Sequence, residues 1–232
     1  MASRPARSAR AVFFDAGNTL VRMDYAAIAG ELLGHGVRVS ATDVQQAEWR
    51  ARVVLDAELG ARPSRHASTE AGSAGDLYSR LILAELGVED GRVIDAVAAW
   101  RRAYNPPVGL WNTVEPVAEA ALRLVRAAGR GAAVISNSNG SVRGILDSLG
   151  LGRHLDFVLD SSEVGVEKPD ARIFRLALQR AGLGPGAAVY VGDLYSVDVL
   201  GARGAGLTAV LLDPGAGWGA RDCPTAPDVL AA

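Results

Sequence analysis

The sequence predicts an α/β protein whose core is a doubly wound, Rossmann-like parallel sheet and which carries a helical cap. Two observations predict this fold. Short, continuous apolar runs alternate with amphipathic helical patterns in the second half of the chain. The stretch that follows the first apolar run contains helical patterns and no convincing strand. Continuous apolar runs are typical of strands covered on both faces, and strands that alternate with helices favour a parallel sheet.

The first strand is expected at Ala11–Phe14, where a continuous apolar run ends at the carboxylate of Asp15 and a glycine-containing turn follows. The later strands are expected at Ala132–Ile135, Phe157–Leu159, Ala188–Val191 and Thr208–Leu212. Amphipathic helices are expected between them, from Pro116 to Gly129, from about Ile145 to Gly150, and from Ile173 to Gly182. Proline near a helix start and glycine just after its end are the usual boundary signals.

The helical segment runs from about Tyr25 to Tyr104 and contains three apolar stripes. They consist of Val44, Ala47, Ala51, Val54 and Leu55; of Leu77, Leu81 and Ala84; and of Val93, Val97, Trp100 and Tyr104. We interpret these stripes as core, residues 60–75 as a mobile loop, and residues 105–109 as a linker back to the sheet.

Two structural regions are therefore expected. Residues 8–22 and 110–232 would form the Rossmann-like core, and residues 23–109 would form the helical cap. The insertion leaves and re-enters near the carboxyl end of the first strand. Ligands of open α/β sheets bind at that edge, so the cap is expected to act as a lid over it.

Composition excludes several classes of protein. The 232 residues are 49% hydrophobic, which suffices for a sizeable core, and the net charge of −2 gives no reason to expect nucleic acid or an anionic membrane as partner. No apolar run approaches the roughly 20 residues that span a bilayer. The single cysteine, Cys223, excludes an internal disulfide. The basic first ten residues are read as a frayed tail, and the protein as soluble and cytoplasmic.

Functional side chains follow the predicted strands in a fixed order. Asp15 follows the first strand, Ser136 follows the second, Lys168 comes next, and Asp193 follows the fourth, with Asp198 five residues later. Each residue alone also suits an N-cap or an ordinary strand end. Their shared placement at strand ends makes the functional interpretation the stronger one.

These residue types suit the attack of a carboxylate on phosphorus. Such a reaction needs an aimed, ionised nucleophile, a cation and a basic side chain to neutralise the phosphoryl oxygens, and donors that hold the phosphate. Asp15 and Asp193 offer oxygens for Mg²⁺, Ser136 offers a hydroxyl, and Lys168 offers a point charge. Lys168 is the only lysine beside 23 arginines, which indicates a position where guanidinium does not substitute for ammonium.

Together these motifs resemble those of the haloacid dehalogenase superfamily. Asp15–Leu20 is similar to its first motif, Ser136 to its second, Lys168-Pro169 to its third, and Gly192-Asp193 with Asp198 to its fourth. The resemblance implies a hydrolase, and the likeness to its phosphatases implies that Asp15 forms an aspartyl-phosphate intermediate. It implies Mg²⁺ held by Asp15, Asp193 and the carbonyl of Gly17, with Asp198 in support. It also implies substrate binding by Thr19, Ser136, Asn137 and Lys168.

The chain departs from the phosphatase pattern at Gly17, where most phosphatases of this superfamily carry an aspartate that protonates the leaving group. General acid–base catalysis contributes about 10²–10⁴-fold, so slow turnover of alkyl phosphates or a preference for aryl and acyl phosphates is expected. Alternatively a cap residue supplies the acid, with Asp24 and Tyr25 nearest in sequence.

The expected activity is therefore a Mg²⁺-dependent phosphatase of a small phosphorylated metabolite, as monomer or homodimer. Two alternatives stay open, a metal-independent 2-haloacid dehalogenase and a non-catalytic binding or regulatory protein. Gly192-Asp193 favours phosphoryl chemistry over dehalogenation, because a dehalogenase has Ser-Asn at that place. A phosphonoacetaldehyde hydrolase is disfavoured because residues 23–109 contain no lysine for a Schiff base.

Overall fold

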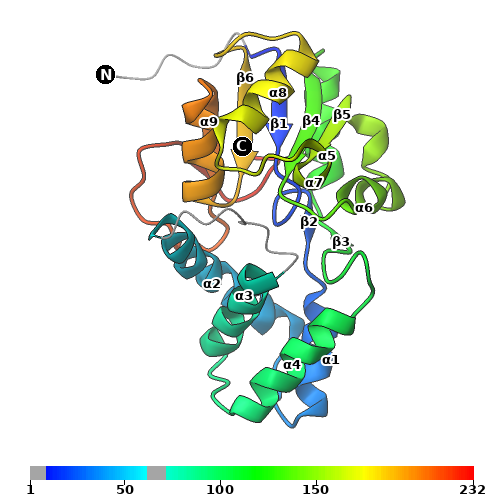
Figure 1. Ribbon diagram of the computed structural model, residues 1–232, viewed down its shortest axis with the longest axis vertical. Helices are drawn as coiled ribbons and strands as arrows, with labels where there is room; N and C mark the ends of the chain where they lie inside the picture. The colour runs from blue at the N-terminus through cyan, green and yellow to red at the C-terminus, as the bar shows by residue number, and fades with distance from the viewer. Residues whose placement is uncertain (1–8, 62–71) are drawn as a thin grey trace.

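The computed structural model describes residues 9–61 and 72–232, and its main feature is a six-stranded parallel sheet with helices on both faces (Figure 1). The sheet has the order β5-β4-β1-β6-β7-β8, and every neighbouring pair is parallel. Its strands are β1 (Ala11–Phe14), β4 (Gly131–Ser136), β5 (Phe157–Asp160), β6 (Ala188–Gly192), β7 (Thr208–Leu212) and β8 (Thr225–Ala226). The predicted fold class is confirmed, and so are the five predicted strands.

Strand β1 lies in the middle of the sheet, and its register fixes the neighbouring strand ends. Phe14, its last residue, is opposite Val134 of β4 and Val191 of β6. The carboxyl ends of β1, β4 and β6 therefore meet at one edge. Strand order reverses on either side of β1, which is the arrangement that places ligands of doubly wound sheets at this edge.

Both faces of the sheet are covered, as the continuous apolar runs predict. Phe13 belongs to a buried cluster with Phe174 of α8, whereas Phe14 belongs to the other cluster with Leu122 of α5 and Leu146 of α6. The helices of this part are α5 (Ala118–Ala127), α6 (Val142–Ser148), α7 (Ser161–Val164), α8 (Ala171–Ala181) and α9 (Leu200–Gly204), with short turns of other helix types at Gly152–His154 and Tyr195–Val199.

Four helices lie between β1 and the rest of the sheet in sequence, and we call them the helical unit. They are α1 (Tyr25–Gly34), α2 (Ala41–Ala61), α3 (Gly72–Glu85) and α4 (Gly91–Ala103). The chain enters and leaves this unit through an antiparallel pair of short strands, β2 (Val21–Arg22) and β3 (Thr113–Val114). The unit lies at one end of the sheet part (Figure 1), and the described residues within it form no strand. The domain boundaries at 22/23 and 109/110 stay a prediction.

The predicted apolar stripe of α3 is one residue out of phase with the structure. Leu77 and Leu81 are only partly buried and Ala84 is exposed, whereas Tyr78, Ile82 and Leu83 are buried. Tyrosine has a polar hydroxyl, so a count of aliphatic residues missed the position that faces the core. On α2 the predicted stripe is buried except at Val54, which is 42% exposed.

Both ends of the loop predicted at residues 60–75 are helical. Gly60 and Ala61 end α2, and residues 72–75 begin α3, while residues 62–71 lie outside the described residues. The basic tail at residues 1–8 also lies outside them. The two-residue strands β2, β3 and β8 were not predicted because a dipeptide carries no periodicity.

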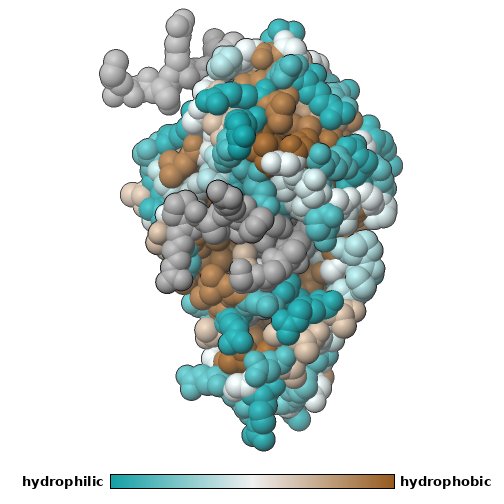
Figure 2. Space-filling view, in the orientation of Figure 1, coloured by the Kyte–Doolittle hydropathy of each residue, from teal (hydrophilic) through white to brown (hydrophobic). Residues whose placement is uncertain are grey.

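The surface of both parts is mixed in character. On the face in Figure 2, hydrophilic and hydrophobic residues alternate, and hydrophilic residues cover the end of the helical unit farthest from the sheet. None of the helices within the described residues is long and apolar enough to cross a membrane.

Candidate active site

Asp15 is delivered to the edge of the sheet by β1 and is held by its own backbone. Its N–H donates to the carbonyl of Val191 in β6, at 2.9 Å, so it continues the ladder by one residue. The chain then turns sharply, and the N–H groups of Leu20 and Val21 donate to the carbonyl of Ala16 at 2.9 Å each. Asp15 is buried, with 7% of its surface exposed. The turn thus fixes a carboxylate at the strand end.

Lys168 joins the acidic groups at this edge. Its Nζ donates to Asp15 Oδ1 at 2.5 Å, to Asp198 Oδ1 at 2.8 Å and to the hydroxyl of Tyr190 at 3.0 Å. Only 3% of its side chain is exposed. An ammonium with three donors is therefore fully paired here, which explains why this position differs from the arginines of the chain.

Burial and pairing shift the pKa values of this pair. Burial raises the pKa of Asp15 from 3.8 to about 6, although the charge of Lys168 opposes this rise. Burial alone would lower the pKa of Lys168, but the carboxylates of Asp15 and Asp198 outweigh it and raise that pKa. Lys168 is therefore a permanent cation, and Asp15 is ionised at neutral pH.

The side chain of Asn137 clamps the backbone that carries this lysine. Its Nδ2 donates to the carbonyl of Lys168 at 2.9 Å, and the N–H of Lys168 donates to its Oδ1 at 2.8 Å. Asn137 follows β4, so this two-bond contact ties the lysine loop to the edge of the sheet. Asn137 also lines the cavity over Asp15, and its predicted role in substrate binding stays a prediction.

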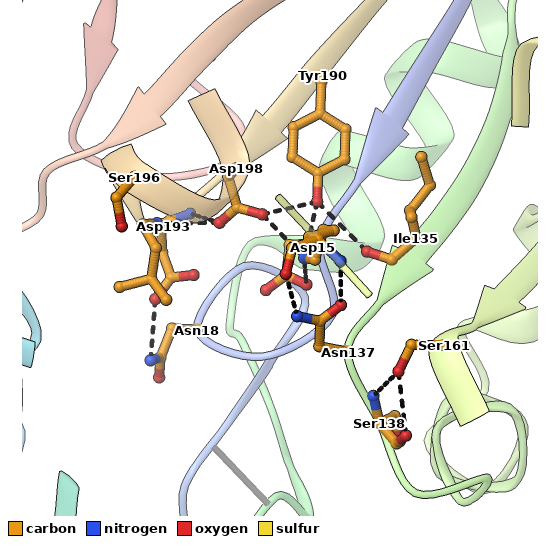
Figure 3. Close-up of polar contacts among 12 residues, drawn as sticks. Asp15, Asn18, Ile135, Asn137, Ser138, Ser161, Tyr190, Asp193, Ser196 and Asp198 are labelled. Atoms are coloured by element: carbon orange, nitrogen blue, oxygen red, sulfur yellow. Dashed lines mark hydrogen bonds and ion pairs between the residues drawn. The ribbon is translucent and has the colours of Figure 1, made fainter. Parts of the chain in front are cut away.

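Asp198 is a structural anchor as much as a member of the acidic group. Its Oδ1 accepts from Lys168 and from the hydroxyl of Tyr190, at 2.9 Å for the latter, and its Oδ2 accepts from the N–H groups of Asp193 and Leu194 at 3.1 and 3.0 Å (Figure 3). A Cβ on Gly192 would lie 2.5 Å from Asp198 Cγ. Glycine is therefore required at position 192 of the Gly192-Asp193 pair, because any larger residue would collide with the carboxylate of Asp198.

Asp193 connects the sheet to the helical unit. Its Oδ2 accepts from Asn18 Nδ2 at 3.1 Å (Figure 3) and lies 3.3 Å from Nε of Arg52, which belongs to α2. Burial raises the pKa of Asp193 well above its usual value, while the charge of Arg52 opposes the shift. Its other oxygen, Oδ1, accepts no side-chain hydrogen bond from the described residues.

Glu48 is the centre of the helical unit's polar contacts. It is completely buried and accepts from Arg52 Nε and Nη2 at 2.9 and 2.8 Å. It also accepts from the hydroxyl of Tyr25 at 3.0 Å, from the hydroxyl of Tyr78, and from Asn18 Nδ2 at 3.1 Å. Glu48 and Arg52 thereby form a neutral pair that meets the sheet part at Asn18 and Asp193.

The space beside Gly17 is filled by the ring of another residue. A Cβ on Gly17 would lie 3.2 Å from Cζ3 and 3.4 Å from Cη2 of the indole of Trp111. Trp111 is buried, with 7% exposed, and follows the segment that returns from the helical unit. The space that an acid would use therefore borders an aromatic ring.

The cavity over Asp15 brings most of the predicted site residues together. It has a volume of about 50 Å³, and its lining includes Asp15, Gly17, Ser136, Asn137, Lys168, Asp193 and Asp198. Ser136 lines this cavity, and no hydrogen bond of its hydroxyl to another described side chain is found. Cys223, His35 and His154 are not part of the described lining, and His66 lies outside the described residues.

Three residues considered from sequence do not reach the cavity. Thr19 is fully buried, does not line the cavity, and its hydroxyl has no partner among the described residues. Asp24 caps α1 by accepting from the N–H of Ala27 and also accepts from the hydroxyl of Tyr104. The hydroxyl of Tyr25 donates to Glu48. Neither Asp24 nor Tyr25 lines the cavity, so neither is placed to replace the acid missing at Gly17.

Several site residues were missed by sequence reasoning, namely Asn18, Glu48, Arg52, Tyr78, Trp111 and Tyr190. A signal existed for two of them. Glu48 and Arg52 are four residues apart and follow Val44 and Ala47 on the buried stripe of α2, so they place two charges within an apolar face. The others are ordinary core or turn residues in sequence.

The acidic group fits a divalent cation. Among the described residues, Asp15, Asp193 and Asp198 each offer an oxygen within 4.8 Å of the others. Both oxygens of Asp198 are already occupied by donors, so the first two are the better ligands. With all groups ionised, the four buried carboxylates, which include Glu48, face two cations, Lys168 and Arg52. Two negative charges remain, which is the deficit that a hard divalent cation with oxygen ligands would neutralise.

Comparisons with known proteins agree with this fold. Residues 9–206 match the haloacid dehalogenase-like hydrolase family. The haloacid dehalogenase-like hydrolase domain-containing protein 3 of Bos taurus is 32% identical over 88% of this chain and 81% of its own length.

Two further relatives differ in activity. A phosphoserine phosphatase of Thermus thermophilus is 45% identical over 43% of this chain and 41% of its own length. The crystal structure of a 2-haloacid dehalogenase from Pseudomonas syringae is 25% identical, has a TM-score of 0.56, and covers 96% of this chain and 95% of that chain. The matched length and the strand-end residues together establish that this chain belongs to the haloacid dehalogenase-like hydrolase family.

Proposed function

We propose that this protein is a Mg²⁺-dependent phosphatase of a small phosphorylated metabolite and that Asp15 is its nucleophile. The observation that carries the proposal is the unbalanced charge of the buried site, where four carboxylates face two cations. Phosphoryl transfer needs a cation beside an ionised nucleophile, whereas displacement of a halide from carbon does not. The relation to a phosphoserine phosphatase is consistent with it.

The residues of this chain would divide the work as follows. Asp15 attacks phosphorus, and its bond to Lys168 keeps one carboxylate oxygen in place while the other reacts. Lys168 also presents a positive charge to the phosphoryl oxygens, and the hydroxyl of Ser136 donates to one of them. The pKa of about 6 leaves Asp15 ionised at neutral pH.

The cation would be held by Asp15, by Asp193 and by the carbonyl of Gly17, with Asp198 fixing the backbone of Asp193. When bound, Mg²⁺ would supply positive charge for the phosphoryl oxygens and the two carboxylates. Asn137 positions Lys168 and Tyr190 supports both Lys168 and Asp198, so these two act through their neighbours.

A metal-free 2-haloacid dehalogenase is the second candidate, and one contact favours it. Arg52 already places a guanidinium 3.3 Å from Asp193, so a cation of the protein itself stands beside the acidic group. The absence of an acid at Gly17 also suits a halide, which leaves without a proton. The two negative charges that remain uncompensated among the buried carboxylates favour the phosphatase, because that activity uses a divalent cation.

The test is phosphate release from phenyl phosphate and chloride release from 2-chloropropionate, each with Mg²⁺ and with chelator. Asp15→Asn is the matched control, because it keeps the shape of the side chain and removes the nucleophile. We expect phosphate release that needs both Mg²⁺ and Asp15, and no chloride release.

The other outcomes are equally definite. Chloride release in the presence of chelator that is lost in Asp15→Asn would establish the dehalogenase. Binding of Mg²⁺ and inorganic phosphate by calorimetry, without turnover of a panel of phosphate esters and anhydrides, would establish a binding protein and overturn the proposal.

A further inference from the structure

The indole of Trp111 stands where the general acid of a phosphatase would project. The six-membered ring of the indole faces position 17, because the nearest atoms to a Cβ on Gly17 would be Cζ3, Cη2 and Cε3, at 3.2, 3.4 and 3.5 Å. The closest of these distances is shorter than ordinary van der Waals contact, so glycine and tryptophan fit each other as a pair. The ring is also buried, which leaves it little freedom to move aside.

Trp111 is also part of a wall between two cavities. Together with Tyr78 it lines both the cavity over Asp15 and a neighbouring cavity of about 250 Å³. The lining of the second cavity is partly apolar, with Met23, Val108 and Leu110. It also includes Arg101 and Arg102, both of which pair with Asp76. The second cavity therefore adjoins the cavity that holds the nucleophile at the shared residues Tyr78 and Trp111, and it could receive the group attached to a phosphate.

We propose that Trp111 determines the leaving group of this enzyme and selects planar aryl phosphates over alkyl phosphates. The inference rests on the proposed phosphatase function and deepens it. An aryl oxide is the conjugate base of an acid with a pKa of about 10, as in tyrosine, and leaves without a proton. An alkoxide resembles hydroxide, whose conjugate acid has a pKa of about 16, and needs an acid that Gly17 does not supply.

The aromatic wall provides affinity as well as selection. An aryl ring would gain contact with the rings of Trp111 and Tyr78, whereas an alkyl chain of similar size would gain less, because offset-stacked and edge-to-face aromatic pairs add to area burial. The chemical step balances without a protein acid. An oxygen of Asp15 forms a bond to phosphorus, the bond from phosphorus to the aryl oxygen breaks, and the aryl oxide leaves with the electron pair and takes a proton from water. A second water then hydrolyses the aspartyl phosphate to phosphate and restores Asp15.

The first experiment compares kcat/KM for phenyl phosphate and ethyl phosphate in four proteins: the wild type, Trp111→Ala, Gly17→Asp and the double variant. In Trp111→Ala we expect the phenyl-to-ethyl ratio to fall about 10-fold, through loss of the aromatic contact. In Gly17→Asp we expect loss of activity on both esters, because the new side chain meets the ring. In the double variant we expect ethyl phosphate activity to rise about 10²-fold above that of Trp111→Ala, because the acid then has room.

Matched controls separate this effect from general damage. Trp100→Ala removes a partly buried tryptophan of α4 that lines neither cavity, and it should leave the phenyl-to-ethyl ratio unchanged. Trp111→Leu keeps an apolar side chain at the wall and removes the ring, so it serves if Trp111→Ala does not fold. A Gly17→Asp protein that hydrolyses ethyl phosphate well with Trp111 in place would overturn the proposal. So would a ratio that stays unchanged in both Trp111 variants.

A binding measurement keeps this inference distinct from the function on which it rests. Calorimetry with phenylphosphonate and ethylphosphonate, which are not hydrolysed, reports the aromatic preference without turnover. If the wild type releases no phosphate from any ester, the proposed function fails. If the wild type releases phosphate but binds both phosphonates with equal affinity, which is the result we expect only for Trp111→Ala, then only the role of Trp111 fails.

Discussion

The two sides of the site are both built from buried charges, but they differ in balance. The sheet side contributes three carboxylates, Asp15, Asp193 and Asp198, and one cation, Lys168, which pairs with the first and the last of them. The helical-unit side pairs Glu48 with Arg52 and surrounds Glu48 with hydroxyl and amide donors. An excess of buried charge must be met by something the protein binds, whereas a neutral pair is complete. The difference suggests that the sheet side is built for chemistry and the helical-unit side for holding the two parts together.

Removal of Lys168 should cause the largest loss of stability and activity among the substitutions considered. Lys168→Met leaves Asp15 and Asp198 buried without their cation, and removal of one partner of a buried ion pair costs about 3–5 kcal/mol. We expect the free energy of unfolding in urea to fall by that amount and phosphatase activity to disappear. Mg²⁺ should recover part of the stability. A variant as stable as the wild type without metal would show that the charge deficit is not real.

The contribution of the buried ion pairs on the helical-unit side can be measured by comparing substitutions of two arginines of α2, one buried and one exposed. Arg52→Met breaks buried contacts with Glu48 and Asp193, and we expect it to lower the free energy of unfolding by about 3 kcal/mol. Arg50→Met removes an exposed pair with Glu85, in which the arginine side chain is 52% exposed, and should cost less than about 1 kcal/mol. Equal effects of the two substitutions, measured by urea unfolding, would mean that burial does not distinguish these pairs.

The charge deficit also predicts a pH dependence of the metal-free protein. Burial raises the pKa of Asp15 from 3.8 to about 6 in the folded state. The folded state therefore binds the proton of Asp15 more tightly than the unfolded state does. This contribution to the free energy of unfolding is fully present below pH 3.8 and is lost as the pH rises through about 6, by at most about 3 kcal/mol. The raised pKa of Lys168 does not contribute in this range, because its stabilisation is lost only above its ordinary value of 10.5.

Comparison with Asp15→Asn isolates this effect from the other carboxylates. The free energy of unfolding of the wild type minus that of Asp15→Asn should decrease between about pH 4 and 7 in chelator, and Mg²⁺ should reduce the decrease. A difference that does not change with pH would place the pKa of Asp15 near its ordinary value.

Sequence predicted the sheet side far better than the helical-unit side, for a physical reason. Each sheet-side residue follows a strand, and parallel strands bring their carboxyl ends together, so strand positions alone place Asp15, Ser136 and Asp193 at one edge. Glu48 meets Asn18 only through the packing of α2 against the turn after β1. No sequence period encodes that contact.

The same reason explains why the contacts of Thr19 and Asn137, and the buried stripe of α3, could not be predicted. A hydroxyl in the turn after Asp15 suggests a phosphate ligand, but the backbone of that turn buries the Thr19 side chain away from the cavity. The amide of Asn137 holds the backbone of Lys168, although the residue also lines the cavity. The identity of a polar residue predicts what it can bond, and the fold decides which partner is nearest.

The clamp between Asn137 and Lys168 has a consequence for how such proteins diversify. It fastens the lysine to the end of β4 through bonds that involve no residue of the helical unit. The bond between Lys168 and Asp15 likewise lies within the sheet part. Evolution could therefore exchange or reshape the inserted helices, and with them the compounds admitted, while the reactive pair is inherited intact. Relatives that share this pair and differ in the compounds they consume are the expected outcome of such a division.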